Sequence, residues 1–583
     1  HLSIRRQRQM CIRDRDTEIR CLDDLTFDAI YVATGAGGTD FGLVQNPGGA
    51  FASTRPGLFL GGSLTGRDTM GALADGLKAS HALERFLKVG SMNHPVETTA
   101  TKLKLDPSRI PAVPSVVPPG GGVYTQEEAI AEAKRCLLCA CDACYRACDL
   151  MHYFRKFPKR IAEEIHLSVY PGTLDGNGTL ATRLMSTCNQ CGLCRSVCPE
   201  GIDTGDLFLQ GHRAMQTQGA MPWAWHHVFL EDLAFANGEA SLSRGSSPSR
   251  YLFFPGCQLG ASDPRYVTES YRFLRQHEPD TALLLGCCGA PAEWAGDESR
   301  RHEVTAWILS QWEAYGRPTF ILACPTCRLM FGRHLPEIPT TTLYELLSEH
   351  AAIPVMPERE TVSVFDPCAS RHDPGVQQAV RKLAEKAGFQ LQPLPMSGEL
   401  AQCCSWGGQV AVAHLPYAAF MVKERISAGE HPYLAYCSNC RDSFAKAGKS
   451  VRHILDVVFG LGGADRTPPT LTERRTRRLA LKRALLAEYW NEYLPEEKPT
   501  MDLTIAPELR AKLSDAYLLE GDVAAVIDHC ERTGRKVEDP DTGRFFGHLQ
   551  LGPMTYWVEY QPGPLGGFEL LNAYAHRMAI EEA

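Results

Sequence analysis

A multidomain α/β protein with a duplicated central unit is the fold class that this sequence predicts. Ten cysteines between Cys257 and Cys440 fall into two copies of one pattern. Short apolar runs lead into these cysteines and end at Gly or Pro, as buried strands do, and helical stretches separate them. Alternating strands and helices indicate a parallel sheet. At roughly 150 residues per domain, a chain of 583 residues allows about four domains.

The apolar runs place the cysteines where strands end. We expect helices at 300–315 and 375–387, and strands at 251–254, 282–285, 320–323 and 362–365. Open α/β sheets build their sites at the carboxyl ends of their strands. The cysteines of each copy should therefore meet at one edge of a sheet.

Each copy contains a first cysteine, an adjacent pair and a Cys-x-x-Cys that opens Cys-x-x-Cys-Arg-x-x-Phe. The two sets are Cys257, Cys287, Cys288, Cys324 and Cys327, and Cys368, Cys403, Cys404, Cys437 and Cys440. A structural zinc site uses four donors, commonly two spaced Cys-x2-4-Cys pairs. Five thiols with an adjacent pair fit a polynuclear iron–sulfur cluster better. Zinc sites or buried free thiols are the alternative.

Both copies resemble the paired CCG domains of the heterodisulfide reductase catalytic subunit, which also occur in anaerobic glycerol-3-phosphate dehydrogenase and in lactate-utilisation proteins. The resemblance covers residues 250–350 and 360–460. It implies that each set holds a non-cubane [4Fe-4S] cluster, and that all ten cysteines are both metal ligands and catalytic residues. The second copy reads Cys-Cys-Ser-Trp-Gly where the first reads Cys-Cys-Gly-Ala-Pro.

Composition excludes several classes of function. A formal net charge of −8 gives no reason to expect nucleic acid or an anionic membrane as a partner. No apolar run approaches the roughly 18 residues that a spanning helix needs. The chain has 22 cysteines, largely in Cys-x-x-Cys clusters, and no signal peptide is recognisable. These features predict a reducing, cytoplasmic compartment and metal binding in place of disulfides.

The first residues are expected to be foreign to the fold. The chain begins with His, and Met10–Arg15 matches the translation of a sequencing adapter. We therefore set residues 1–15, including Cys11, apart from the fold. We expect the natural protein to continue upstream, so that this sequence is its C-terminal portion.

Residues 16–92 contain two candidate strands and a helix. Strands are expected at 27–35, which ends in Ala-Thr-Gly, and at 57–62, with a helix over 69–87. This segment resembles the tail of a pyridine nucleotide-disulfide oxidoreductase such as the glutamate synthase small subunit. The resemblance implies an FAD- and NAD(P)-binding domain whose helix amides face the flavin. The implied cofactor-binding residues are Gly35, Gly62, Ser63 and Thr69.

Two departures bear on this flavin site. Ser63 stands where the family has Asp, and the Gly-x-Gly-x-x-Gly loop is absent. We therefore expect FAD and NAD(P) in the full-length protein but not in this fragment. An unrelated α/β fragment is the alternative.

After a linker at 93–123, Thr125-Gln-Glu-Glu128 predicts a capping box and a helix that leads to a cysteine cluster. The spacing of Cys136, Cys139, Cys144 and Cys148 resembles a cluster motif of the glutamate synthase small subunit. Cys141 is then spare, or replaces Cys139 or Cys144.

Cys188, Cys191, Cys194 and Cys198-Pro form the bacterial ferredoxin run. In two-cluster ferredoxins the fourth cysteine ligates the other cluster, so Cys148 would complete the second site and Cys198 the first. The intervening stretch reads as helical at 154–165 and 181–186, which favours a helical dicluster [4Fe-4S] ferredoxin domain over 124–240. Residues 241–249 are Ser-rich and predict a linker.

The C-terminal part offers no catalytic motif. Residues 461–500 predict a linker and a basic helix at 471–494, with a solvated or docking face. Residues 501–583 predict a small α+β domain of unknown role, with a helix at 521–534, aromatic-rich strands over 545–572 and a buried Cys530. This domain suits a partner-binding module.

Together these resemblances imply a flavin- and iron–sulfur-dependent oxidoreductase of anaerobic metabolism. Electrons from NAD(P)H would pass through two [4Fe-4S] cubanes to the two non-cubane clusters, which would reduce a disulfide-type acceptor. The alternatives are a relay to quinone or to a separate reductase, or a non-catalytic subunit that wires a larger complex. Redox partner proteins are expected in each case.

Overall fold

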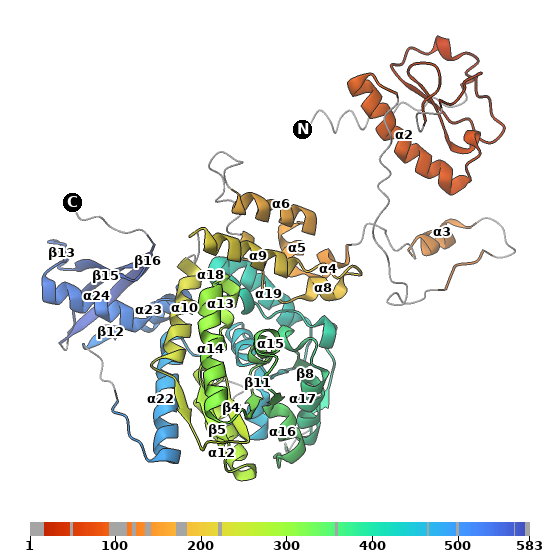
Figure 1. Ribbon diagram of the computed structural model, residues 1–583. Coiled ribbons are helices and arrows are strands. Elements are labelled where there is room, and N and C mark those ends of the chain that lie inside the picture. Colours follow the sequence, from red (N-terminus) through yellow and green to blue (C-terminus); the bar gives the residue numbers. More distant parts are fainter. Residues whose placement is uncertain are drawn as a thin grey trace. The chain divides into compact units, whose positions relative to one another are not determined.

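The computed structural model describes most of the chain, which divides into two units, His1–Lys104 and Leu105–Ala583 (Figure 1). The described residues are 17–46, 51–92, 114–118, 124–134, 142–170, 184–219, 224–355, 360–462, 466–496, 501–564 and 566–577. Within these ranges, no helix is both long enough and apolar enough to cross a membrane.

The first unit has a parallel strand pair beside one long helix. β1 (Ile30–Val32) pairs in parallel with β2 (Leu58–Leu60), and α2 (Thr69–Val89) follows. Two short 3-10 helices, η1 (Leu22–Asp24) and η2 (Gly62–Thr65), complete it. The predicted helix therefore forms, and both strands form but are shorter than the predicted 27–35 and 57–62. The assignment to a flavoprotein stays a prediction.

The first copy of the cysteine pattern, named the first CCG copy after the domains that it resembles, is built on a five-stranded sheet in the order β3-β5-β4-β6-β7. Its parallel strands are β4 (Tyr251–Phe254), β5 (Ala282–Leu285), β6 (Thr319–Leu322) and β7 (Thr340–Thr342). The first two have the predicted bounds, and the third is shifted by one residue. The surrounding helices are α11 (Leu259–Ser262), α12 (Pro264–His277), α13 (Ala290–Ala295), α14 (Glu298–Ala314), α15 (Pro325–His334) and α16 (Leu343–His350).

The linker predicted at 241–249 is wrong in part. β3 (Leu242–Arg244) lies in this segment and pairs antiparallel with β5 at the edge of the sheet. The Leu242 side chain is buried in the core shared by both copies. The strand was missed because the segment is rich in Ser, which predicts a linker, and Leu242 is its one buried apolar residue in the sheet.

The second CCG copy repeats the parallel sheet in the order β11-β10-β8-β9. Its strands are β8 (Thr361–Phe365), β9 (Gln390–Leu391), β10 (Tyr433–Ala435) and β11 (Val451–His453). Its helices are η6 (Cys368–Ser370), α17 (Pro374–Lys386), η7 (Gly398–Leu400), η8 (Gly407–Gln409), α18 (Val410–Ala413), α19 (Leu415–Ser427), α20 (Ser438–Lys446) and α21 (Ile454–Val458).

One hydrophobic core joins the two copies. It includes Phe253 and Tyr271 from the first copy and Val380 and Tyr436 from the second. The Tyr344 hydroxyl lies 2.7 Å from the carbonyl oxygen of Ala323 and 2.9 Å from that of Tyr436. These backbone positions directly precede Cys324 and Cys437, so the packing of the copies fixes two cysteine loops relative to each other.

The basic helix forms as α22 (Leu471–Trp490) and docks on the CCG copies, so that of the two predicted alternatives the solvated face is wrong. Leu481, Leu485 and Leu486 lie in the core shared by the CCG copies, and Arg474 and Arg478 are buried. The arginines are buried because carboxylates far away in sequence pair with them, which the local sequence does not reveal.

The predicted dicluster region is helical. Its helices are α3 (Gln126–Ala133), α4 (Ala143–Ala147), α5 (Asp149–Phe154), α6 (Pro158–Val169), α8 (Leu193–Val197), α9 (Thr204–Thr217) and α10 (Ala224–Asn237). The Thr125 capping box forms as predicted. The helix predicted at 154–165 is instead split, with Arg155 at φ 53° and Pro158 opening α6. Residues 181–183 of the other predicted helix lie outside the described ranges.

The C-terminal part is a sheet in the order β12-β16-β15-β14-β13, covered by two helices. Its elements are β12 (Leu503–Ile505), α23 (Pro507–Asp515), α24 (Glu520–Thr533), β13 (Val537–Glu538), β14 (Phe545–Leu551), β15 (Met554–Pro562) and β16 (Phe568–His576). The predicted helix and aromatic strands are present. Cys530 is buried in the core of this sheet.

Candidate functional site

The five cysteines of the first CCG copy meet beyond the carboxyl ends of three neighbouring strands. β4, β5 and β6 lead into Cys257, Cys287 and Cys324, respectively. Thiol hydrogen bonds link Cys257 to Cys287, Cys287 to Cys288, and Cys327 to Cys288 and Cys324. Gly256 has φ +78°, and a Cβ there would lie 2.9 Å from the Cys327 sulfur. The glycine thus lets the chain pass close to the thiols.

The second copy gathers its cysteines in the same way. Thiol hydrogen bonds link Cys368 to Cys403 and Cys403 to Cys404, and the Cys440 sulfur lies 3.1 Å from that of Cys404. A thiol hydrogen bond also links Cys437 to Cys440. The structure therefore brings together each set of five that the sequence predicts. Their roles as ligands and as catalytic groups stay predictions.

Helix N-termini and backbone amides face several of these sulfurs. Cys324 and Cys437 are the N-cap residues of α15 and α20, so the positive ends of two helix dipoles point toward the Cys-x-x-Cys thiols. Hydrogen bonds from Cys368, from Cys404 and from the amides of residues 405 and 407 lower the pKa of Cys403. Such N–H···S bonds tune the potentials of iron–sulfur clusters.

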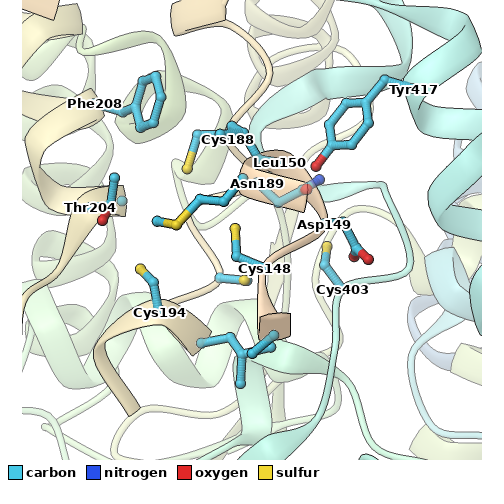
Figure 2. Close-up of a pocket in the computed structure, with 16 residues that line it drawn as sticks. Cys148, Asp149, Leu150, Cys188, Asn189, Cys194, Thr204, Phe208, Cys403 and Tyr417 are labelled. Atoms are coloured by element: carbon cyan, nitrogen blue, oxygen red, sulfur yellow. The ribbon is translucent and has the colours of Figure 1, made fainter. Parts of the chain in front are cut away.

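A third group of thiols lies in the helical region. Cys148, at the junction of α4 and α5, lines one cavity with Cys188, Cys191 and Cys194. Figure 2 shows Cys148, Cys188 and Cys194 around this cavity, with Cys403 of the second CCG copy on its other side. This is the grouping that crossed ligation requires, and the ligand set itself stays a prediction.

Burial shapes the protonation of these thiols. Desolvation raises the pKa of Cys148 and Cys188 well above the usual range, and raises that of Cys191 to about 12. The amide of Gln190 donates to the Cys188 sulfur over 3.4 Å. A buried thiol becomes a thiolate only beside positive charge, which a metal ion supplies on binding.

The other predicted cubane is described only in part. Cys144 and Cys198 are partly exposed, in α4 and directly after α8, and these two helices pack together. Cys136, Cys139 and the spare Cys141 lie outside the described residues. Which cysteines complete this set therefore stays open.

The predicted flavin residues lie around the strand ends of the first unit. Gly35 follows β1 with φ +92°, while Gly62 and Ser63 form the start of η2. Thr69 begins α2, where the Asp68 side chain accepts a hydrogen bond from the amide of Gly71. A carboxylate thus caps the helix end that the sequence assigns to the flavin. These four assignments stay predictions.

The thiol sets suit iron–sulfur clusters better than single metal ions. A single structural zinc ion takes four donors. Each CCG set instead offers five thiols, and in the second copy four of them are buried while Cys368 is partly exposed. Buried sulfur-only donors with N–H···S bonds fit a polynuclear iron–sulfur cluster.

The ferredoxin-like loop contacts the second CCG copy directly. Asn189 Nδ2 donates to the carbonyl oxygen of Gly407 over 2.9 Å. Arg371 Nη2 lies 3.3 Å from the carbonyl oxygen of Cys191. The Arg425 guanidinium pairs with Asp149 at 2.7 Å. The two cysteine sets are therefore held against each other by backbone and charged contacts.

A second cavity adjoins the first. It is lined by all five cysteines of the second CCG copy, together with Cys191 from the ferredoxin run and Trp294, Met330 and Arg333 from the first copy. Cys191 and Cys403 line both cavities. The second CCG set thus lies between the ferredoxin-like thiols and a wall formed by the first copy.

Sequence reasoning missed a polar network beside the first CCG set. Gln258 Nε2 lies 3.7 Å from the Cys257 sulfur and 3.3 Å from Asp232 Oδ2. Arg474 donates to Gln258 Oε1 at 3.0 Å and to Asp442 Oδ2 at 2.6 Å. Arg478 pairs with Asp232. The one feature of the sequence that could have indicated this network was the high number of arginines in the segment that forms α22.

Comparisons with known proteins agree with the two predicted cysteine-rich regions. Residues 135–203 match the 4Fe-4S dicluster domain family, and residues 251–332 and 362–444 match the CCG cysteine-rich domain family. These matches confirm the prediction of a dicluster domain and a CCG pair. The resemblance of residues 16–92 to a flavoprotein stays a prediction.

Two curated proteins are similar to this chain at low identity. One, from Methanosarcina barkeri, is a component of dihydromethanophenazine:CoB–CoM heterodisulfide reductase; it is 24% identical over 278 residues, which cover 41% of this chain and 66% of that protein. EtfAB:quinone oxidoreductase of Syntrophomonas wolfei is 23% identical over 256 residues, which cover 38% of this chain and 36% of that protein. The chain therefore spans less than two thirds of either relative, and both are oxidoreductases.

Among solved structures, a hypothetical protein from Helicobacter pylori is similar over 53% of this chain and 67% of its own. The TM-score is 0.35 and the sequence identity 11%. A likeness of this size carries no argument about fold or function.

Proposed function

We propose that this chain is an iron–sulfur electron-transfer oxidoreductase whose CCG pair reduces a disulfide-type acceptor. Electrons from a flavin and NAD(P)H module would enter through the dicluster domain. Cys136, Cys139, Cys144 and Cys198 would hold one cubane [4Fe-4S] cluster, and Cys148, Cys188, Cys191 and Cys194 the other. The ten CCG cysteines would hold two non-cubane clusters.

The observation that carries this proposal is the contact between the ferredoxin-like thiols and the second CCG set. Cys191 and Cys403 line both adjoining cavities, and hydrogen bonds hold residues 188–191 against residues 371 and 407. Electron exchange needs short separations, and this contact supplies one. The second CCG set is accordingly the point at which electrons would enter the pair.

The wall of the second cavity supports an acceptor site between the copies. Trp294, Met330 and Arg333 of the first copy line this cavity together with the five cysteines of the second. When bound, a non-cubane cluster with five thiolates would supply iron able to take up a substrate sulfur. Arg333 would attract an anionic group on the acceptor, and Trp294 and Met330 would exclude water from it.

Two cysteine variants test the order of the sites. A small viologen donor can reach the CCG site directly, so Cys191→Ser should keep viologen-linked reduction of hydroxyethyl disulfide. Cys404→Ser should lose that activity, because Cys404 belongs to the adjacent pair of the second set and not to the ferredoxin run. Electron paramagnetic resonance should still detect the cubane signals in the Cys404→Ser protein.

Cys21→Ser is the matched control, since Cys21 is exposed and belongs to neither cysteine region. It should behave as the wild type. If Cys191→Ser and Cys404→Ser both keep full viologen-linked activity, disulfide reduction does not occur at the second CCG set. If the wild-type protein reduces no disulfide with viologen as the donor, disulfide reduction is not its function. The chain would then relay electrons to quinone or to a separate reductase, or would transfer electrons within a larger complex without catalysis.

A further inference from the structure

A large groove lies beside both CCG sets without being lined by any of their cysteines. Its volume is about 470 Å³, within the range of sites for small organic ligands. Gln258 and Ser405 line it, and they directly follow Cys257 and Cys404. A ligand in this groove could therefore contact a residue that directly follows a cysteine of each set.

Three aromatic side chains line the groove near these two residues. The ring centroids of Phe229 and Trp406 lie 6.1 Å apart in an edge arrangement, and those of Phe229 and Tyr517 lie 5.7 Å apart. The Arg474 guanidinium lies 5.3 Å from the Trp406 ring centroid. These rings come from α10, the second CCG copy and the C-terminal part, and they offer flat apolar surfaces to a planar ligand.

The charged side chains at this end of the groove are paired with one another. Asp442 pairs with Arg474 at 2.6 Å, Asp232 with Arg478, and Lys446 with Asp515 at 2.5 Å. Further along, α19 contributes the apolar Ala418, Val422 and Ile426 to the wall, together with the exposed Lys423. At the end with the aromatic rings the charges are paired, and this favours an uncharged ring there.

Ser405 contributes a hydroxyl group to the lining of the groove. The residue is 5% exposed, and within the described residues no hydrogen bond of its hydroxyl is found. Its φ is 80°, a left-handed value that favours glycine, and the first copy has Gly289 with φ +88° at the equivalent position. The second copy thus keeps a hydroxyl in a backbone conformation that is strained for a residue with a side chain.

We propose that this groove binds a planar, uncharged aromatic carrier of the quinone class. The ring would lie among Phe229, Trp406 and Tyr517, and the Ser405 hydroxyl would donate a hydrogen bond to a ring carbonyl. Trp406 lines both this groove and the cysteine-lined acceptor cavity, whereas no cysteine lines the groove. A redox role for the carrier rests on the proposed function, whereas its binding does not.

The test is calorimetric titration of the oxidised, anaerobically reconstituted 583-residue chain with duroquinone. All four ring positions of duroquinone carry methyl groups, so it does not add to thiols. We expect saturable binding at one site per chain. Ala419→Trp should raise the dissociation constant at least tenfold, because Ala419 is an exposed residue of α19 that lines the groove. Ser405→Ala should raise it about fivefold.

Ala428→Trp is the matched control, because Ala428 is exposed at the end of the same helix and does not line the groove. It should bind duroquinone as the wild type does, and 1,4-cyclohexanedione, which is neither planar nor aromatic, should not bind. No saturable binding, or equal binding by wild type and Ala419→Trp, would overturn the proposal. Self-association that Ala419→Trp abolishes, without duroquinone binding, would make the groove an interface between copies instead.

Discussion

Gly408 lies where the second CCG copy meets the ferredoxin-like loop, and Gly408→Ala should loosen that contact. Its φ is +65°, and an added Cβ would lie 2.2 Å from the carbonyl oxygen of Cys188 and 3.0 Å from the Cα of Asn189. Ordinary contact begins at 3.4 Å, so the two loops must separate by 1.2 Å, the difference between 3.4 and 2.2. Both neighbours are backbone atoms and cannot turn aside.

Two costs add up at this position. A left-handed alanine costs about 1–2 kcal/mol, and overpacking costs about 1–3 kcal/mol. The opening free energy of the contact should therefore fall by about 2–5 kcal/mol. Hydrogen exchange, followed by mass spectrometry in peptides covering 184–198 and 403–414, measures this opening locally.

Gly219→Ala provides the control, because Gly219 has φ +72° and nothing within 4 Å of an added Cβ. It should show only the conformational cost, and no change in exchange at residues 403–414. Equal exchange at the loop contact in Gly408→Ala and wild type would refute the steric reasoning. Such a result would also mean that the close contact between the two loops, on which the proposed electron route depends, is absent.

Two further substitutions test the packing around the CCG sets. Ser405→Gly should raise the free energy of unfolding by about 0.5–1 kcal/mol, because relief of the left-handed strain outweighs the added entropy of the unfolded chain. A lower urea midpoint than that of the wild type would contradict this. Gly289→Ser should lower the free energy of unfolding. Asp232→Asn should lower the stability by about 3–5 kcal/mol, because it leaves Arg478 buried without its charge partner. Glu231→Gln, at an exposed neighbouring site, should change the thermal midpoint little. An equal loss of stability in both variants would mean that the buried pair does not stabilise this region.

Much of the fold could be predicted from local patterns. The strands at 251–254 and 282–285 are continuous apolar runs ended by Pro or Gly, and they form with the predicted bounds. The duplicated cysteine pattern predicted the grouping of thiols, because parallel strands bring their carboxyl ends to one edge. These signals lie within a few residues of the elements that they specify.

The rest depended on contacts between distant segments. β3 is short and Ser-rich, and only Leu242 and its pairing with β5 hold it in the sheet. The arginines of α22 look solvated in sequence, but Asp232 and Asp442, more than 30 residues away, neutralise them in the interior. Local composition carries no information about such partners.

The candidate site shows the same division. The cysteines were found from their spacing, whereas the position of Cys191 against Cys403 depends on how the helical region packs on α19. The groove lined by Gln258, Ser405 and Trp406 was not predicted. It forms only where the two CCG copies and the C-terminal part pack together, and nothing in the sequence around each residue indicates this packing.

The central claim is that the two CCG sets hold iron–sulfur clusters beside a dicluster domain. Iron, zinc and acid-labile sulfide should be measured per chain after anaerobic reconstitution of the 583-residue protein. Four [4Fe-4S] clusters predict about sixteen irons, a matching amount of sulfide and only traces of zinc. About eight irons, with zinc at the CCG cysteines, would contradict the claim.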